Sequence, residues 1–245
     1  NVESIFFLNN DDERLREYFW ILDSKFTYAS KDEFKSNLNA NIELDDELHP
    51  ILNFYNEKIK FTAKLKSQGL NFAYNAIPAA SVGLHYDVPI IDITEALENF
   101  QTDNSSGYGR MLVEKLQDVA ILNDTYNANP NSMNLALKTL DKYKIADKKI
   151  AVLGDMLELG DASIDEHTAI LHVADEIADL VFIFGNEFRQ AYEKFNSIKI
   201  KHFDSKDELF ENLKSEISPT TAILVKGSRG MRMEEIVEKI KNYQG

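Results

Sequence analysis

The sequence predicts an α/β protein whose C-terminal part holds a mainly parallel sheet covered by helices on both faces. From about residue 119 onward, short apolar strands alternate regularly with helical segments, which is typical of parallel strands joined by crossover helices. A polar stretch at residues 101–109 (QTDNSSGYG) contains two glycines and no aliphatic side chain, so it is the predicted domain linker. The region before the linker has a different pattern and is predicted to be a separate domain.

The N-terminal region begins with an apolar run at residues 4–8 (SIFFL), which predicts a buried parallel strand followed by a helix to about residue 22. Such a strand is expected to belong to a sheet whose other strands lie upstream. Between residues 25 and 67, short pieces alternate apolar and polar side chains and predict a small antiparallel section. Two helices are expected near residues 71–86 and 93–100.

Beyond the linker, each expected strand leads into a helix. In such sheets ligands bind beyond the carboxyl ends of the strands. The expected strands cover residues 119–123, 149–153, 180–184, 198–203 and 222–225, and the expected helices cover residues 132–143, 164–178, 187–195, 206–217 and 231–242.

Composition narrows the class of protein. The chain has 245 residues and a net charge of −14, which disfavours nucleic acid or an anionic membrane surface as the main partner. It has no cysteine, so disulfides, thiolate metal sites and a cysteine nucleophile are excluded. No apolar stretch approaches the roughly 20 residues that cross a bilayer. We therefore predict a soluble cytoplasmic protein.

A polar run, NDTYNANPNS at residues 123–132, follows an apolar strand and precedes a helix. Its side chains should stand at the carboxyl edge of the sheet, where Asp124 and Asn127 suit ribose hydroxyls or phosphates. The structural alternative is an Asx-rich turn that caps the following helix at Asn131 or Ser132.

A second run, KGSRGMRM at residues 226–233, holds the densest basic cluster in this acidic chain. Lys226, Arg229 and Arg232 point to a phosphate or carboxylate ligand, and two glycines free the backbone at the helix start. The alternative is a solvated basic turn. The run is not a Walker A loop, because G-x-x-x-x-G-K-[ST] occurs nowhere in the chain.

A third run, GDMLELGDASIDEH at residues 154–167, places Asp155 and Glu158 on a loop after a buried strand. These carboxylates suit a cationic amine, although plain solvation explains them equally well. Ser163 and Glu166 fit a helix capping box. His167 lies five residues from His172, about 140° around a helix, so the two are not expected to share a metal ion.

Two weaker candidates are single residues. Arg110 follows the linker in GYGR, where an arginine can reach a nucleotide held mainly by a neighbouring domain. Asn75 lies in GLNFAYNAIPAA, on the first turns of an expected helix. Each is equally compatible with a structural role, as a surface arginine and as a packed polar residue.

Together these runs resemble the Mur ligase family. The matching segments are NDTYNANPNSM, IAVLGDMLELG followed by His167, and LVKGSRGMRMEEIV, in the order and spacing of the family. The resemblance covers nearly the whole chain and is tight from Arg110 onward. It implies the end of a Mur ligase central domain over residues 1–105 and a Rossmann-like C-terminal domain over residues 106–245. The family's usual His-Asn pair is replaced here by Asn71-Phe72.

The resemblance is closest to the branch that joins D-alanyl-D-alanine to UDP-N-acetylmuramoyl-tripeptide in peptidoglycan synthesis. It implies ATP and Mg²⁺, an acyl-phosphate intermediate and a monomer, with the Mg²⁺ ligands upstream of this chain. By position, Asn75, Arg110, Asp124 and Asn127 would bind the nucleotide. Asp155, Glu158, Ser228 and Arg232 would bind the peptide substrates, and Lys226 with Arg229 would be catalytic.

Two alternatives remain at this stage. One is a sibling ligase, a folylpolyglutamate synthase or the enzyme that adds the third peptide residue. The latter's arginine-containing acceptor motif is absent, and GDMLELG stands in its place. The other is a nucleotide-binding module without catalysis, because the family's phosphate-binding loop is not in the chain. For the same reason we expect the chain alone to be inactive as a ligase.

Overall fold

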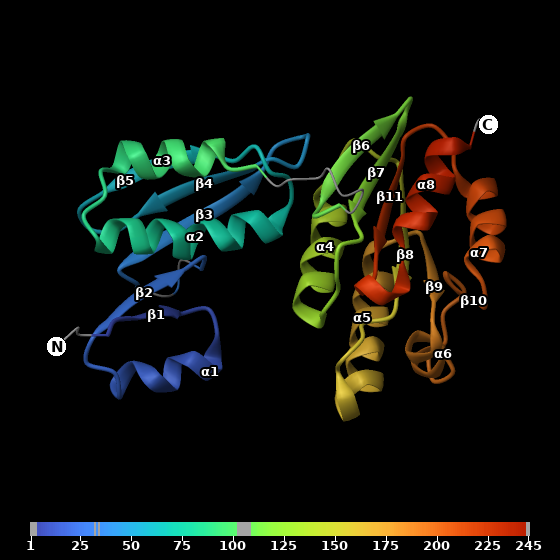
Figure 1. The fold of residues 1–245 in the computed structure, drawn as a ribbon, viewed down its shortest axis with the longest axis horizontal. Helices are drawn as coiled ribbons and strands as arrows, with labels where there is room; N and C mark the ends of the chain where they lie inside the picture. Colours follow the sequence, from blue (N-terminus) through green and yellow to red (C-terminus); the bar gives the residue numbers. More distant parts are fainter. Residues whose placement is uncertain (1–3, 32, 34, 102–108, 244–245) are drawn as a thin grey trace. The chain divides into compact units, whose positions relative to one another are not determined.

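The computed structural model describes residues 4–31, 33, 35–101 and 109–243. It divides into two compact units, the first comprising Asn1–Asp45 and His49–Gln101 and the second Asp46–Leu48 and Thr102–Gly245 (Figure 1). The domain boundary expected between residues 105 and 106 lies outside the described residues and stays a prediction.

The first unit holds a five-stranded sheet in the order β1-β2-β3-β4-β5. The first three strands are parallel and the last three are antiparallel, so the expected antiparallel section is correct for β3 to β5. It is wrong for β2, which pairs in parallel with both of its neighbours. The strands are β1 (Phe6–Asn9), β2 (Lys25–Ala29), β3 (Leu38–Leu44), β4 (Pro50–Tyr55) and β5 (Lys60–Lys64).

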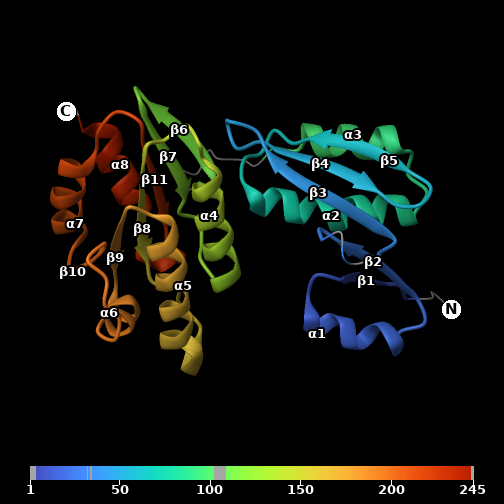
Figure 2. The same cartoon turned by 180° about the vertical axis from the view of Figure 1, so that it is seen from behind.

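Helices α2 (Leu70–His85) and α3 (Ile90–Asn99) pack on one face of this sheet, and Figure 2 shows the same unit from behind. Alternate strand residues such as Leu52, Phe54 and Ala63 turn towards these helices and are buried with them. The helix expected up to residue 22 is shorter. It consists of α1 (Glu13–Arg16) and a 3₁₀ turn, η1 (Glu17–Trp20).

The second unit holds a six-stranded sheet in the order β10-β9-β8-β11-β7-β6. All neighbours are parallel except β6, which forms an antiparallel hairpin with β7 at one edge and was not predicted. The strands are β6 (Leu112–Leu116), β7 (Val119–Asp124), β8 (Lys148–Gly154), β9 (Leu180–Phe184), β10 (Ile200–Phe203) and β11 (Thr221–Lys226).

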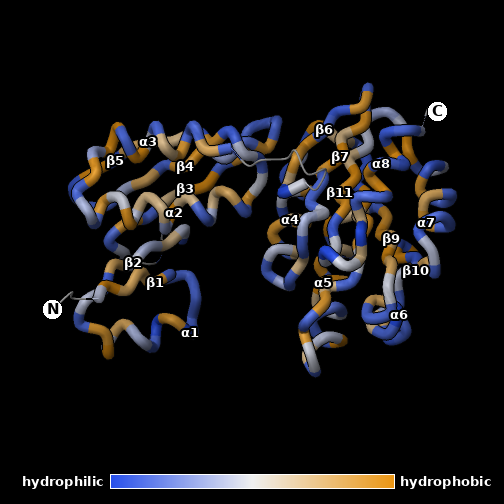
Figure 3. Tube along the Cα trace, viewed as in Figure 1, coloured by the Kyte–Doolittle hydropathy of each residue, from blue (hydrophilic) through white to orange (hydrophobic). Residues whose placement is uncertain are grey.

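Helices cover both faces of this sheet, as predicted, with α4 and α5 on one face and α7 and α8 on the other (Figure 1). The strands between them are strongly hydrophobic (Figure 3), and residues 221–226 of β11 are buried throughout. The helices are α4 (Pro130–Lys142), α5 (Ser163–Ile177), α6 (Asn186–Tyr192), α7 (Lys206–Leu213) and α8 (Glu234–Asn242), with 3₁₀ turns η2 (Gly160–Ala162), η3 (Lys214–Glu216) and η4 (Arg229–Met231).

Two helix caps differ from expectation. The N-cap of α4 is Asn129 instead of Asn131 or Ser132, and it forms a capping box in which the Asn129 and Ser132 side chains each accept the other's backbone N–H. The capping box expected from Ser163 and Glu166 is wrong, because the N-cap of α5 is Ala162 and the Ser163 hydroxyl donates to Glu187 instead. No helix in the described residues is long and apolar enough to cross a bilayer.

Candidate functional site at the carboxyl edge of the second sheet

The loops that follow β7, β8 and β11 meet at one edge of the second sheet. Strand β11 lies between β7 and β8, and its last residue, Lys226, is in register with Asp124 and Leu153. The three polar runs singled out in the sequence start at these strand ends. The parallel topology therefore brings them together, although they are up to about 100 positions apart.

Lys226 and Asp124 form a buried ion pair at the centre of this edge. The Lys226 ammonium donates to one Asp124 carboxylate oxygen at 2.7 Å and to the backbone oxygen of Asn127 at 2.8 Å. The second carboxylate oxygen accepts the backbone N–H of Met111 at 3.0 Å. Lys226 is 1% exposed and Asp124 4%, so both charges face inward in this conformation and are satisfied by the protein.

Arg110 precedes Met111, whose N–H binds Asp124, and its side chain is exposed. Its guanidinium carbon stands 3.6 Å from the ring centroid of Tyr126, which is also exposed. Gly109 permits this placement, because a Cβ there would lie 2.1 Å from the backbone oxygen of Asn123. Tyr126 was not predicted as a site residue, although it lies within the NDTYNANPNS run that was.

Asn127 and Arg229 join the loops after β7 and β11. The side-chain oxygen of Asn127 accepts the backbone N–H of Arg229 at 3.3 Å, and both side chains are exposed. Arg232 is exposed at φ 51° and its Nε lies 3.0 Å from a Glu235 carboxylate oxygen. The helix expected from residue 231 starts at residue 234, after η4.

Ser228 is buried and connects three loops. Its hydroxyl donates to the backbone oxygen of Ala128 at 3.3 Å and accepts the backbone N–H of Leu157 at 2.8 Å. Its own N–H donates to the backbone oxygen of Asp155 at 3.0 Å. The hydroxyl expected to bind substrate thus holds the edge of the sheet together.

Asp155 and Glu158 occupy different environments on the loop after β8. The Asp155 carboxylate accepts the N–H groups of Glu187 and Phe188, at 3.1 and 2.9 Å, and so caps the start of α6. Burial is the main reason why the pKa of Asp155 is raised above its ordinary value. Glu158 is exposed at φ 67° and extends from the tip of the loop.

His167 lies at this edge and was not among the predicted site residues, although it is part of a segment that matches the family. Its Nε2 accepts the backbone N–H of Met156 at 2.9 Å, and its Nδ1 lies 2.7 Å from the backbone oxygen of Ser163. A proton on Nδ1 and none on Nε2, the neutral imidazole, satisfies both contacts. His167 is fully buried and its ring contacts Phe188 edge-on.

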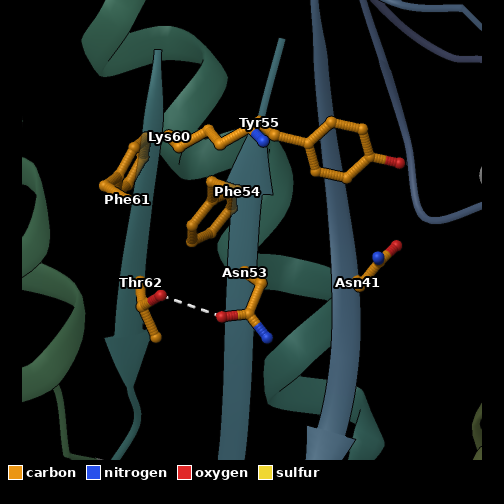
Figure 4. A pocket seen from close by; sticks show the side chains of 7 residues that line it. All are labelled: Asn41, Asn53, Phe54, Tyr55, Lys60, Phe61 and Thr62. Atoms are coloured by element: carbon orange, nitrogen blue, oxygen red, sulfur yellow. Dashed lines mark hydrogen bonds between the residues drawn. The ribbon is translucent and has the colours of Figure 1, made fainter.

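Asn75 lies apart from these residues in the chain, exposed on α2 of the first unit. The first unit also has a hollow of about 630 Å³ on the face of β3, β4 and β5 (Figure 4). Within it Thr62 donates to Asn53 at 2.8 Å. None of the predicted site residues lines this hollow, which is formed by Asn41, Asn53, Phe54, Tyr55, Lys60, Phe61 and Thr62.

Comparison with known proteins identifies the family. Residues 109–229 match the family described as Mur ligase, glutamate ligase domain. The matched range includes the loops that follow β7 and β8, and the loop after β11 as far as Arg229. The chain belongs to the Mur ligase family. The UDP-N-acetylmuramoyl-tripeptide–D-alanyl-D-alanine ligase of Bacillus subtilis is 30% identical over 177 residues, which span 70% of this chain and 38% of that Mur ligase. The Buchnera aphidicola enzyme of the same name is 34% identical over 69% of this chain and 36% of its own length.

Solved structures show the same fold. The crystal structure of MurF from Acinetobacter baumannii superposes with a TM-score of 0.84 at 24% identity, covering 99% of this chain and 52% of that one. MurF ligase from Thermotoga maritima, solved in complex with ADP, gives 0.78 at 24% identity, with 96% and 52% covered. The α/β fold expected from the family resemblance is confirmed. The chain spans well under half the length of these curated Mur ligases and about half of the solved ones.

Proposed function

We propose that this chain forms the C-terminal part of a cytoplasmic ATP-dependent ligase that joins D-alanyl-D-alanine to UDP-N-acetylmuramoyl-tripeptide in peptidoglycan precursor synthesis. The observation that carries the proposal is the meeting of three loops at one sheet edge. There, exposed arginines and an exposed glutamate surround a buried ion pair. Similarity to ligases of that name, over about 70% of the chain, supports the same reaction.

The proposed reaction has two steps. A carboxylate oxygen of the tripeptide takes the γ-phosphoryl group of ATP, and ADP leaves. The amine of D-alanyl-D-alanine then attacks the acyl carbon, loses a proton, and the C–O bond to phosphate breaks. Both steps gather negative charge on phosphate oxygens, which fixed cations stabilise most as the charge develops.

The exposed cations at the edge suit these charges. We assign Arg110 and Asn127 to the nucleotide and Arg229 to the reacting phosphate as the catalytic cation. Lys226 and Asp124 are buried against each other, so their proposed part is to fix the loop that carries Asn127.

The loop after β8 is assigned to the peptide substrates. Glu158 is exposed and acidic, so it suits the ammonium group of the dipeptide. Arg232, also exposed, suits a substrate carboxylate. Asp155 and Ser228 support this loop through hydrogen bonds from inside the fold.

No group of three His, Asp or Glu side chains in the described part of the chain is placed to hold a metal ion by itself. We therefore assign no Mg²⁺ ligand to the described residues.

The test uses the full-length product of the gene that encodes this chain. Phosphate release is measured with ATP, UDP-N-acetylmuramoyl-tripeptide and one acceptor at a time: D-alanyl-D-alanine, L-alanine or glutamate. Of the three acceptors, we expect only D-alanyl-D-alanine to support turnover. We expect no turnover from residues 1–245 by themselves. Turnover with a folate and glutamate in place of these substrates would instead indicate a folylpolyglutamate-type sibling, and ATP binding without turnover would indicate a non-catalytic module.

A matched pair of variants tests the catalytic cation. Arg229→Ala should lower turnover of the full-length enzyme by about 10²–10³-fold. Lys239→Ala, which removes a half-buried lysine paired with the exposed Asp207 on α7, should leave turnover within about two-fold of the parent. Equal turnover of the two variants would remove Arg229 from the proposed site.

A further inference from the structure

The loop formed by residues 154–159 is here called the β8 loop, and beyond Gly154 it contains no helix or strand. The backbone N–H groups of its residues 155–157 are nevertheless all hydrogen-bonded. The N–H of Asp155 donates to the backbone oxygen of Phe184 at 3.2 Å. The next two N–H groups, of Met156 and Leu157, donate to His167 on α5 and to Ser228 after β11. Three different elements therefore fix three consecutive residues.

Of the three hydrogen-bond acceptors that hold the β8 loop, only His167 must be in a particular protonation state to accept. A buried backbone N–H that loses its acceptor is costly, and only an unprotonated Nε2 can accept from Met156. The opposite ring nitrogen is held by the backbone oxygen of Ser163 at 2.7 Å, which selects this tautomer. A carboxylate oxygen of Asp155 lies 3.9 Å from Nε2.

The hydrogen-bonded residues 155–157 lead directly to Glu158, the residue assigned to the ammonium group of D-alanyl-D-alanine. Its backbone has a φ of 67°, a conformation that residues other than glycine rarely adopt. Its placement therefore depends on the hydrogen bonds of the residues before it. Arg110 and Asn127, assigned to the nucleotide, lie on segments flanking β6 and β7 and are not held by His167.

We propose that His167 is a positioning residue for the acceptor dipeptide. As a neutral imidazole it holds the β8 loop in the conformation that presents Glu158, and it touches no substrate itself. This inference rests on the proposed function. Loss of the His167 acceptor should weaken use of D-alanyl-D-alanine and leave use of ATP largely intact.

Two substitutions separate the anchor from general packing. In His167→Gln the side-chain oxygen reaches about as far as Nε2 and keeps an acceptor for Met156. In His167→Asn the shorter side chain keeps a donor near Ser163 and has nothing near Met156. Amide hydrogen exchange of residues 1–245 reports the anchor directly. We expect the Met156 amide to exchange about 10-fold faster in the Asn variant and within about three-fold of the parent in the Gln variant.

Kinetics of the full-length enzyme report the consequence. In His167→Asn the KM for D-alanyl-D-alanine should rise about 10-fold, while the KM for ATP stays within about two-fold of the parent. In His167→Gln the KM for D-alanyl-D-alanine should return to near the parent value. Should the Asn variant fail to fold, Ser228→Ala loosens the same loop at Leu157. It also removes the hydrogen bond to Ala128, beside Asn127, so in this variant the KM for D-alanyl-D-alanine should rise more than the KM for ATP.

Unchanged Met156 exchange in the Asn variant would overturn the anchor. Faster exchange with an unchanged KM for the dipeptide would overturn the positioning role. If the full-length parent does not ligate D-alanyl-D-alanine at all, the proposed function fails and the positioning role fails with it. The exchange experiment would still show whether His167 holds the loop, so the two failures are distinguishable.

Discussion

The ammonium of Lys226 and the carboxylate of Asp124 lie 2.7 Å apart, with 1% and 6% of their side chains exposed, although 102 positions separate them in the chain. This pair joins the carboxyl ends of β11 and β7. Its burial means that removing one partner leaves an uncompensated charge inside the protein.

We therefore predict that Lys226→Met destabilises residues 1–245 by about 3–5 kcal/mol, measured by urea unfolding. The double variant Lys226→Met with Asp124→Leu should recover part of the loss, because no unpaired charge stays buried. Lys239→Met, which breaks a solvent-accessible ion pair with the exposed Asp207, should cost about 0–1 kcal/mol. A cost below about 1 kcal/mol for Lys226→Met would mean that the pair is open to water.

Arg110 should act on the nucleotide. In the full-length enzyme, Arg110→Ala is expected to raise the KM for ATP by about 10- to 150-fold, since a charge-assisted contact is worth about 1.5–3 kcal/mol. Tyr126→Leu removes only the ring beneath the guanidinium, worth about 0.5–1 kcal/mol at an exposed site, and should raise it about two- to five-fold. Steady-state kinetics at saturating peptide substrates would measure both effects, and an unchanged KM in Arg110→Ala would contradict the assignment.

Gly185 should resist substitution far more than Gly160. Both have positive φ, of 120° and 58°. A Cβ at Gly185 would lie 2.2 Å from Asp155 Cγ, whereas a Cβ at Gly160 meets nothing within 4 Å. Gly160→Ala should cost about 1–2 kcal/mol, and Gly185→Ala about 3–5 kcal/mol, because the latter also displaces the carboxylate that caps α6. Equal thermal midpoints for the two variants would show that the start of α6 adapts.

His202 should make stability depend on pH. Burial is the main cause of a pKa lowered below the ordinary 6.5, and the neutral ring reaches the backbone oxygen of Gly185 at 3.1 Å. Between the lowered pKa and 6.5 the unfolded chain binds a proton that the folded chain does not. This contribution to the free energy of unfolding is therefore present above pH 6.5 and is lost as the pH falls below it.

The comparison uses urea midpoints at pH 7.5 and 5.5. His202→Gln keeps a donor for Gly185 and removes the titration, so its midpoint should fall less on acidification than that of the parent. The same fall in both proteins would assign the acid sensitivity to other groups.

The sequence predicted the interior of the second sheet well because its strands are apolar throughout and separated by helices. It missed β6, a half-exposed hairpin strand with the sequence LVEKL and a Gln117-Asp118 turn that lacks the usual glycine signal. It also assigned β2 to an antiparallel arrangement. Strand direction depends on distant partners, and local alternation carries no information about them.

The candidate site was found in the sequence as separate runs, and the parallel topology explains why they meet. Which side chains face inward could not be predicted, because the pairing of Lys226 with Asp124 depends on strand register. For His167 a signal did exist. His167, Ile170, Leu171 and Ala174 have the spacing of one helical face, and all four are buried. A histidine on such an apolar helix face indicates a buried side chain that needs hydrogen-bond partners.

The β8 loop has a consequence for how this protein can change. Its shape is held by Asp155, His167 and Ser228, while the side chain of Glu158 takes no part in those bonds. If Glu158 binds the dipeptide as proposed, substrate preference and integrity of the fold are encoded at different positions of one short segment. Position 158 can vary at little structural cost, most freely towards asparagine or glycine, which tolerate its positive φ. A change of recognition at this position would leave the hydrogen bonds that hold the loop in place.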